Sequence, residues 1–537
     1  MKWLLLACAA CSFHANAAPG DADTDAADAA VDAASDAPPA SQSVHFTSVT
    51  VSVPALQPGL YGIAVDAVLQ NDLDTPITDI QASLGFGGMR STQFWFRDLD
   101  RRDSPSATPQ PTTIAGHASA TFHFIVDARS SCVPPGPVPF NAIATFSDGT
   151  SMKSATQLTP PTSLPFVALN DPIVVTTATD ENTANSTTSL REAIALANTQ
   201  SGLDRITFDP SLANATIMLV RSLNQLPDIT SDLVIDGNGV TIAVDQSWQT
   251  MPGSYGLEIT GGTVVISGLK FKDMGYNYKL EDVSNNNCGN DDVLEGGAIR
   301  VAGGTLILDS NHFTDAGVPE KNCYAAALRF VGGSGHRVLR NTFLAEVMDT
   351  MNIATAMREV SDNTMSSTAD PTKGDDGIFV TSQGNADLWI TGNTIVDKEY
   401  SGVVADGTDI GELYIINNTF LRNGLVANGT VLRGGTRTIH SRNNIFSTDH
   451  PAAYIGNNSG ALLDLAYDDA FGQPECSGCT VVTPTNILTT DPMLDANQVP
   501  MAGSPMIDSG EDWLDRNAKM PGHYNGSGAD RGASETP

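Results

Sequence analysis

The segment Leu388-Trp-Ile-Thr-Gly-Asn-Thr-Ile395 recurs in altered form along the C-terminal part of this 537-residue chain. Each copy carries an Asn at the same position, and these Asn residues stand at 311, 341, 363, 393, 418 and 444. By subtraction the steps are 30, 22, 30, 25 and 26 residues. Repeats of this length, each forming one supersecondary unit, are typical of solenoids. The spacing therefore predicts one repeat for each turn of a right-handed parallel β-helix.

Apolar residues flank the recurring Asn at fixed distances. Alternate side chains of a strand point to opposite faces, so like positions on successive turns should stack in files inside the coil. An Asn at a corner accepts the left-handed backbone conformation and can hydrogen-bond the Asn of the next turn, which predicts a ladder. The expected files contain Leu308, Val338, Val360, Ile390 and Ile415 before the Asn, and Phe313, Phe343, Met365, Ile395, Phe420 and Phe446 after it.

One short helix is predicted just before the repeats, over Ser189-Leu-Arg-Glu-Ala-Ile-Ala-Leu-Ala-Asn198. Ser189 and Glu192 have the spacing of a capping box, and Leu190, Ile194 and Ala197 fall on one helix face. A coil of parallel strands has an open end with unpaired edges, which must be covered. We therefore expect this helix to close the first turn.

The N-terminal residues predict export. Residues 1–17 read as a signal peptide, with Lys2, an apolar stretch and the small-residue cleavage site Ala15-Asn-Ala17. Lipidation of Cys8 or Cys11 is the alternative, because Leu5-Leu6-Ala7-Cys8 is similar to a lipobox. Residues 18–43, rich in Ala and Asp, cannot bury a core and are expected to form a tether.

Residues 44–165 carry short alternating apolar runs bounded by Pro, Gly and Asp, which predicts a small antiparallel β-sandwich domain. Residues 166–537 then form the predicted β-helix domain.

The expected fold class of the whole chain is all-β. No run after the leader is long and apolar enough to span a bilayer, and we expect a monomer.

The chain has 28 Lys+Arg and 61 Asp+Glu, a formal net charge of -33. This charge disfavours nucleic acid as a partner. It also opposes uronic-acid polysaccharides, unless bound Ca²⁺ or a local basic patch intervenes.

Five cysteines follow the leader, an odd number, so one is left unpaired. In an oxidising compartment Cys288 and Cys323 can join two loops, and Cys476 and Cys479 can pair with each other. A zinc or redox site is the alternative for Cys476-Ser-Gly-Cys479, but no second Cys/His pair lies near it.

Several segments resemble one family. Ser189–Ile194, Asp204-Arg-Ile-Thr-Phe208 and Leu233-Val-Ile-Asp-Gly-Asn-Gly239 look like the opening of bacterial surface proteins with a right-handed parallel β-helix of the pectin-lyase-like kind. Gly503-Ser-Pro-Met-Ile-Asp508 and Ala529-Asp-Arg-Gly-Ala-Ser-Glu535 resemble the closing segments of that group. The resemblance implies the fold and a surface location, and says little about chemistry.

Candidate reactive groups gather around Lys373-Gly-Asp-Asp-Gly-Ile-Phe379. Aligning Gly377 with Gly402 brings Lys398 and Glu399 onto the next turn, about 4.8 Å away. Paired carboxylates at a corner suit a glycosidase or a Ca²⁺ site, and the alternative is that they only satisfy turn amides. The candidate catalytic residues are Lys373, Asp375, Asp376, Lys398 and Glu399, and the candidate metal ligands are Asp375, Asp376 and Glu399.

The Gly-Asp-Asp is similar to that of pectin-hydrolysing glycosidases, whose Gly-His-Gly and Arg-Ile-Lys motifs should follow it. Here Gly335-His336-Arg337 precedes it, and no Arg-Ile-Lys exists. Arg300 and Arg329 should occupy consecutive turns, where they either bind a sugar carboxylate or form part of a solvated face.

These patterns support two hypotheses. The preferred one is an exported surface protein, non-catalytic, that binds an extracellular or cell-wall glycan or serves as a structural or adhesion module. The alternative is a polysaccharide lyase or glycoside hydrolase, with Ca²⁺ as the cofactor of a lyase.

Overall fold

The computed structural model describes residues 43–52, 63–85, 94–98, 110–128, 138–156, 162–164, 170–244, 255–274, 296–314, 326–346, 349–367, 376–398, 400–405, 407, 409–424, 430–434, 438–447, 455–456, 462–471, 480–510 and 530–533. Its contacts divide the chain into two compact units, residues 1–99 with 106–167 and residues 100–105 with 168–537. The four predicted disulfide cysteines, Cys8 and Cys11 lie outside the described residues.

The first unit contains two antiparallel sheets. One has the order β1 (Val44–Val51), β2 (Ile63–Asn71), β5 (Ser119–Ala128) and β4 (Phe94–Asp98). In the other, β6 (Val138–Ser147) pairs with β3 (Thr78–Gly85), β7 (Met152–Thr156) and β8 (Thr162–Leu164). Strand β2 alternates between buried and half-buried residues, as a strand with one face on the core should.

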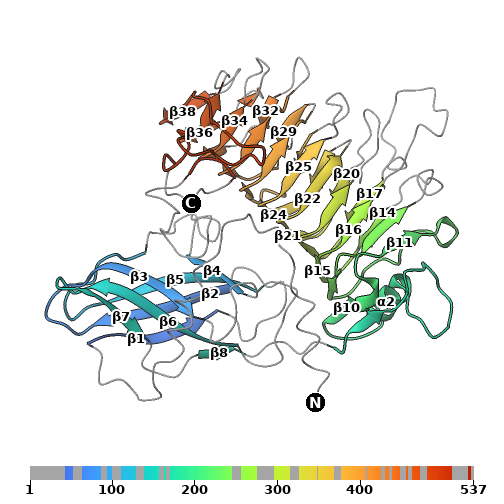
Figure 1. Ribbon diagram of the computed structural model, residues 1–537, viewed down its shortest axis with the longest axis horizontal. Helices are drawn as coiled ribbons and strands as arrows, with labels where there is room; N and C mark the ends of the chain where they lie inside the picture. The colour runs from blue at the N-terminus through green and yellow to red at the C-terminus, as the bar shows by residue number, and fades with distance from the viewer. Residues whose placement is uncertain are drawn as a thin grey trace. The chain divides into compact units, whose positions relative to one another are not determined.

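The second unit is a parallel β-helix with three sheets, which confirms the predicted fold class. Successive strands of the unit stack as parallel arrows from β10 to β38 (Figure 1). Each complete turn places one strand in sheet 1, one in sheet 2 and one in sheet 3. A turn and its three strands are called a rung below.

Each sheet contains every third strand of the regular part of the coil. Sheet 1 consists of β14 (Tyr255–Ile259), β17 (Gly297–Val301), β20 (Ala326–Phe330), β23 (Asp349–Ala354), β26 (Ile378–Ser382), β29 (Ser401–Ala405), β32 (Thr430–Gly434) and β35 (Ile455–Gly456).

Sheet 2 consists of β9 (Ile173–Val175), β10 (Asp204–Phe208), β12 (Leu233–Asp236), β15 (Thr263–Ser267), β18 (Thr305–Asp309), β21 (Ser334–Leu339), β24 (Ala356–Ser361), β27 (Leu388–Thr391), β30 (Leu413–Ile416), β33 (Thr438–Arg442), β36 (Leu462–Ala466) and β38 (Thr480–Thr485).

Sheet 3 consists of β11 (Thr216–Leu219), β13 (Thr241–Val244), β16 (Lys270–Lys272), β19 (His312–Thr314), β22 (Thr342–Glu346), β25 (Thr364–Ser367), β28 (Thr394–Val396), β31 (Thr419–Leu421), β34 (Ile445–Ser447) and β37 (Asp469–Phe471).

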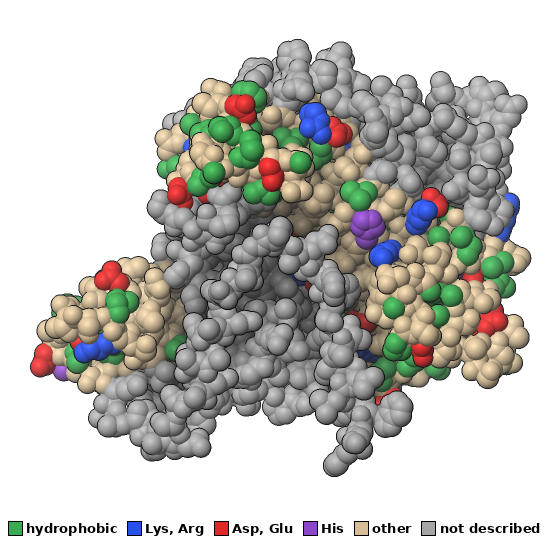
Figure 2. All heavy atoms as spheres, in the orientation of Figure 1, with side chains coloured by type: hydrophobic (Ala, Val, Ile, Leu, Met, Phe, Trp, Pro, Cys, Tyr) green, Lys and Arg blue, Asp and Glu red, His purple; other side chains and the backbone are tan. Residues whose placement is uncertain are grey.

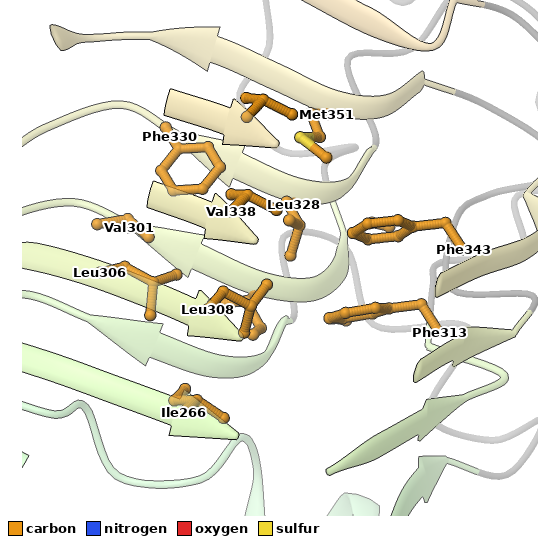
Figure 3. Close-up of a cluster of buried hydrophobic side chains, with 14 of the residues drawn as sticks. Ile266, Val301, Leu306, Leu308, Phe313, Leu328, Phe330, Val338, Phe343 and Met351 are labelled. Atoms are coloured by element: carbon orange, nitrogen blue, oxygen red, sulfur yellow. The ribbon is translucent and has the colours of Figure 1, made fainter. Parts of the chain in front are cut away.

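The predicted interior files are present. Phe313 lies between Phe271 and Phe343 with ring centroids 4.8 and 4.6 Å apart, and Phe420 stacks on Phe446 at 5.1 Å. Figure 3 shows the parallel rings of Phe313 and Phe343 facing the aliphatic side chains of the other two sheets. These side chains are fully buried, so the core is one continuous apolar column.

The Asn ladder is also confirmed. From Asn341 onward, each ladder Asn accepts hydrogen bonds at Oδ1 from the backbone N–H and the side-chain amide of the preceding ladder Asn, at 2.8 to 3.1 Å. Asn311 Oδ1, at the start, accepts from the backbone N–H of Leu269 at 2.9 Å. The ladder residues are at most 3% exposed. The ladder thus satisfies the polar atoms that each corner buries.

The predicted backbone conformation of the ladder Asn was wrong. The positive φ angles belong to the residue before each one, namely Ser310, Arg340, Asp362, Gly392, Asn417 and Asn443. The preceding residue makes the turn, and the Asn side chain is left to point inward and bond its neighbours.

The ladder ends in a carboxylate. Asp468 Oδ1 accepts from Asn444 N at 2.8 Å and from Asn444 Nδ2 at 3.0 Å, as a ladder amide would. Burial raises the pKa of Asp468 to about 6, and it raises the pKa of the adjacent Asp469 to about 7. A proton on Asp468 is therefore held more tightly in the folded chain than in the unfolded one.

The predicted closing helix is α2 (Leu190–Ala197), with the capping box of Ser189 and Glu192 formed. Its buried residues include Leu190, Ile194 and Ala197, and it contacts β9 and β10 at the first rung. Two short 3-10 helices, η2 (Pro210–Leu212) and η3 (Arg221–Leu223), follow in the chain. The side chain of Arg191 forms a buried bidentate pair with Asp180, at 2.8 and 3.0 Å, which fixes the helix on the coil.

Replacing a ladder residue should destabilise the coil. Asn393→Ala removes the acceptor for Asn363 and leaves the carbonyl oxygens of Val360 and Thr391 without their amide donor. We expect the free energy of unfolding to fall by at least about 2 kcal/mol, because several buried groups lose partners at once. Urea denaturation measures the change. Asn497→Ala, at an exposed position, should change it by less than about 0.5 kcal/mol.

Asp468→Asn should stabilise the chain near neutral pH. The wild-type carboxyl contributes most when protonated, and that contribution is lost as pH rises from about 4 through about 6. An amide keeps the acceptor without the buried charge, so we expect a gain of about 2 kcal/mol at pH 8 and little change at pH 4. Thermal unfolding across this pH range tests it. Asp171→Asn, at an exposed position, serves as the control and should keep the pH dependence of the wild type. If the stability of Asp468→Asn depends on pH as strongly as that of the wild type, the assignment is wrong.

Candidate functional site

Those predicted site residues that the structure describes lie on sheet 1 and at the corner that precedes it. Gly377 and Gly402 lie on consecutive rungs, as the alignment predicted, because Ile378 pairs with Val403. Arg300 and Arg329 are also in register on consecutive rungs. Of the candidate catalytic and metal-binding residues, Asp376 and Lys398 are described, whereas Lys373, Asp375 and Glu399 lie outside the described residues.

Lys398 follows β28, and its side chain is fully buried. Its Nζ donates a hydrogen bond to Thr350 Oγ1 at 2.8 Å, and its backbone N–H donates to Asn423 Oδ1 at 3.0 Å. Placing an ammonium group in the interior is costly unless polar or charged groups surround it. The structure supplies such groups at this corner.

Asp349 and Asp376 stand at the same position of consecutive rungs, because Met351 pairs with Ile378. They are 7% and 9% exposed. The backbone N–H of Asp376 donates to Asp349 Oδ1 at 3.2 Å, and that of Thr350 donates to the Asp376 carbonyl at 3.1 Å. We call Asp349, Thr350, Asp376, Lys398 and the buried Ser401 the corner cluster.

The corner cluster continues onto the outer face of sheet 1. Met351 and Ile353 are fully buried in the core, so Thr350 and Asn352, which alternate with them, point outward. Arg329 on β20 and Phe379 on β26 flank Asn352 in register. Arg329 and two of the residues predicted as catalytic, Asp376 and Lys398, therefore belong to neighbouring parts of sheet 1 and its corner.

Arg300, one rung before Arg329, forms an ion pair with Glu258 on β14. The Oε2 atom of Glu258 also accepts from Gln225 at 3.2 Å. Acidic and basic side chains of successive rungs pair elsewhere too, as Arg340 does with Asp309 and Arg422 with Asp397. Blue and red side chains accordingly lie beside one another on the face shown in Figure 2.

His336, in the Gly335-His336-Arg337 segment, has a structural position. It is fully buried, its Nδ1 accepts from the backbone N–H of Leu306 at 3.0 Å, and its Nε2 lies 3.1 Å from the Gly332 carbonyl. Burial lowers the pKa of His336 to about 4. The imidazole is therefore neutral at physiological pH and bonds two backbone groups between rungs.

Asp349, Thr350 and Asn352 were not predicted from the sequence. A usable signal was present, because Asp349-Thr-Met-Asn-Ile353 and Asp376-Gly-Ile-Phe-Val380 both start with Asp and alternate in the same phase. Sheet 1 has no recurring marker like the ladder Asn, so this alignment depended on loop lengths that vary from rung to rung.

Among the described residues, no group of three or more His, Cys, Asp or Glu side chains is placed to hold a metal ion. In the same part of the chain, no helix is long and apolar enough to cross a membrane.

No family model and no curated protein matches the chain. Among solved structures, one match is the catalytic domain of a GH87 alpha-1,3-glucanase in complex with tetrasaccharides, with 11% identity, 86% of this chain and 95% of that chain covered, and a TM-score of 0.30. Another is the Agl-KA catalytic domain, with 12% identity, 83% and 96% coverage, and a TM-score of 0.31.

The buried ammonium of Lys398 should be needed for stability. Lys398→Met keeps most of the apolar stem but removes the charge and the bond to Thr350. We expect the free energy of unfolding to fall by about 3 kcal/mol, the scale for removing one partner from a buried charged cluster. Urea denaturation measures it, with Lys272→Met, whose lysine side chain is 56% exposed, as the control. A variant more stable than the wild type would show that the corner does not need the cation.

Proposed function

We propose that this chain is an exported protein that acts on a polysaccharide at the corner that precedes sheet 1, with the corner cluster as its reactive centre. The observation that carries the proposal is the pair of carboxylates of Asp349 and Asp376, on consecutive rungs beside a buried lysine. Paired carboxylates of this kind are the working parts of most glycoside hydrolases.

The spacing of the rungs favours one stereochemical course. Groups on adjacent parallel strands are about 4.8 Å apart. Retaining glycosidases hold their carboxyl groups about 5 to 5.5 Å apart, whereas inverting enzymes need about 6.5 to 9.5 Å to admit a water molecule. We therefore propose hydrolysis with retention. One carboxyl group protonates the glycosidic oxygen while the other, as a carboxylate, attacks the anomeric carbon and displaces the leaving sugar. Water, activated by the first carboxylate, then cleaves the glycosyl–enzyme ester.

The remaining candidates are assigned by position. Lys373, Asp375 and Glu399 lie within three residues of Asp376 or Lys398 in the sequence, and we propose that they contact the substrate. The predicted Ca²⁺ at Asp375, Asp376 and Glu399 belongs to the lyase alternative, which needs a cation beside a base. For export, we propose that residues 1–17 act as a signal peptide, with a lipid anchor on Cys8 or Cys11 as the alternative.

A second function, binding without cleavage, is favoured by one observation. Asp349, Asp376 and Lys398 are all at most 9% exposed, and each takes part in a hydrogen bond with its neighbours. Buried polar networks of this kind also occur purely to hold a backbone in place. In that case the protein is a surface binding or adhesion module, the first of the two functions expected from the sequence.

Activity assays separate the two functions. The mature protein is incubated with a panel of neutral and uronic-acid polysaccharides, and reducing ends and unsaturated products are measured. We expect reducing ends to form, and Asp376→Asn and Asp349→Asn each to lower the rate by about 10² to 10⁴-fold, the usual contribution of an acid or base. Asp171→Asn, at an exposed carboxylate beyond the corner cluster, should leave the rate unchanged.

Thermal unfolding of the same variants guards against loss of fold. Binding of a polysaccharide by the wild type without any product would refute hydrolysis and support the binding function. Full activity in Asp376→Asn would remove this residue from the mechanism.

A further inference from the structure

Asn352 is a buried amide on the outer side of the coil. Its residue is 3% exposed, and its Nδ2 has no hydrogen-bond partner among the described residues. A buried N–H group without an acceptor is costly, and most such groups in folded proteins are paired. The neighbours Met351 and Ile353 fill the core on the inner side of the strand, so Asn352 is not needed for packing the core. The amide therefore indicates a ligand that brings an acceptor.

The surroundings of Asn352 combine apolar and polar groups. Phe379 on β26 is half-buried and lies in register beside it, and Arg329 lies on the other side, on β20. Thr350, on the same strand face, connects Asn352 to Lys398 and the corner cluster. Ligand sites are typically built from apolar and aromatic surface with a few oriented polar groups.

We propose that Asn352 donates a hydrogen bond from Nδ2 to a hydroxyl oxygen of a neutral sugar unit, which lies against Phe379. This inference rests on the proposed function, because it places the sugar on the same polysaccharide. Asp349 is three residues earlier on β23, about 10 Å along the strand. The sugar bound by Asn352 is therefore one or two units away from the bond that is cleaved.

The negative charge of the chain and of the corner carboxylates favours a neutral sugar over an anionic one. The chain carries a formal net charge of -33, and Asp349 and Asp376 stand at the same corner. Two of the predicted cations are engaged, because Arg300 pairs with Glu258 and Lys398 is buried against Thr350. An anionic chain would be repelled by the overall field and by the carboxylates. A hydroxyl group accepts the amide hydrogen bond without that cost.

Binding is measured with the variant Asp376→Asn, which keeps the substrate intact, and its derivative that also carries Asn352→Leu. The probes are a soluble α-glucan, a β-glucan, a mannan, polygalacturonate and alginate, in affinity electrophoresis and calorimetry. We expect binding to at least one neutral glycan, weakened about tenfold or more by Asn352→Leu, the scale of one lost hydrogen bond to a ligand. Asn497→Ala, exposed and beyond sheet 1, should leave the affinity unchanged.

A stability measurement excludes a merely structural role. Leu has the same number and branching of side-chain heavy atoms as Asn and no polar atom to leave unsatisfied, so Asn352→Leu should keep or raise the melting temperature while it weakens binding. A fall in both would assign Asn352 to the fold and overturn the inference.

The outcomes distinguish this inference from the proposed function. Unchanged affinity in the Asn352→Leu variant, together with cleavage by the wild type, would refute the role of Asn352 and leave hydrolysis standing. If the wild type cleaves nothing but binds a glycan through Asn352, the role of Asn352 stands and hydrolysis is refuted. Tighter binding of polygalacturonate or alginate would overturn the choice of a neutral sugar, and binding of none of the five probes would overturn both proposals.

Discussion

The hydrogen bonds between consecutive ladder asparagines are the constraint on which the coil depends. Each of these corners would otherwise bury a backbone N–H and several carbonyl oxygens in an apolar interior. One amide side chain satisfies groups on its own rung and on both neighbours, so every rung fixes the register of the next. With the register fixed, the interior side chains must stack in files, and the outer residues must stack as well. The candidate site follows from this arrangement, because its residues come from rungs that the ladder holds in phase.

The recurring Asn made much of the fold predictable. The ladder, the phenylalanine file and the closing helix depend on short patterns with fixed spacing, and local geometry alone determines their effect. The end of the ladder was less visible, since Asp468 takes the place of Asn and therefore does not match the repeat. The left-handed residue was misplaced by one position, because a turn pattern does not reveal which of two adjacent polar residues must point inward.

The site was harder to predict for a different reason. Sheet 1 follows loops whose lengths change from rung to rung, so residues such as Asp349 and Asp376 are aligned only when the structure supplies the register. Arg300 and Arg329 were recognised because their rungs share a strong apolar pattern. The partner of Arg300, Glu258, holds the same position of that pattern on the preceding rung. Sequence patterns thus indicated Asp376 and Lys398 of the corner cluster but not the residues that surround them.

The direction of the hydrogen bonds gives the coil a mechanical character. In a parallel β-helix the bonds between strands run along the axis, so a load applied across the two ends acts on the rungs in series, and the weakest terminal rung should open first. Both ends carry clamps. Arg191 ties α2 to Asp180 at the first rung, and Arg531 donates to the carbonyl oxygens of Asp468 and Asn486 at the last, at 2.7 and 2.9 Å. The hydrogen bonds of these two guanidinium groups therefore determine the force at which a terminal rung separates. The long apolar column between them contributes less.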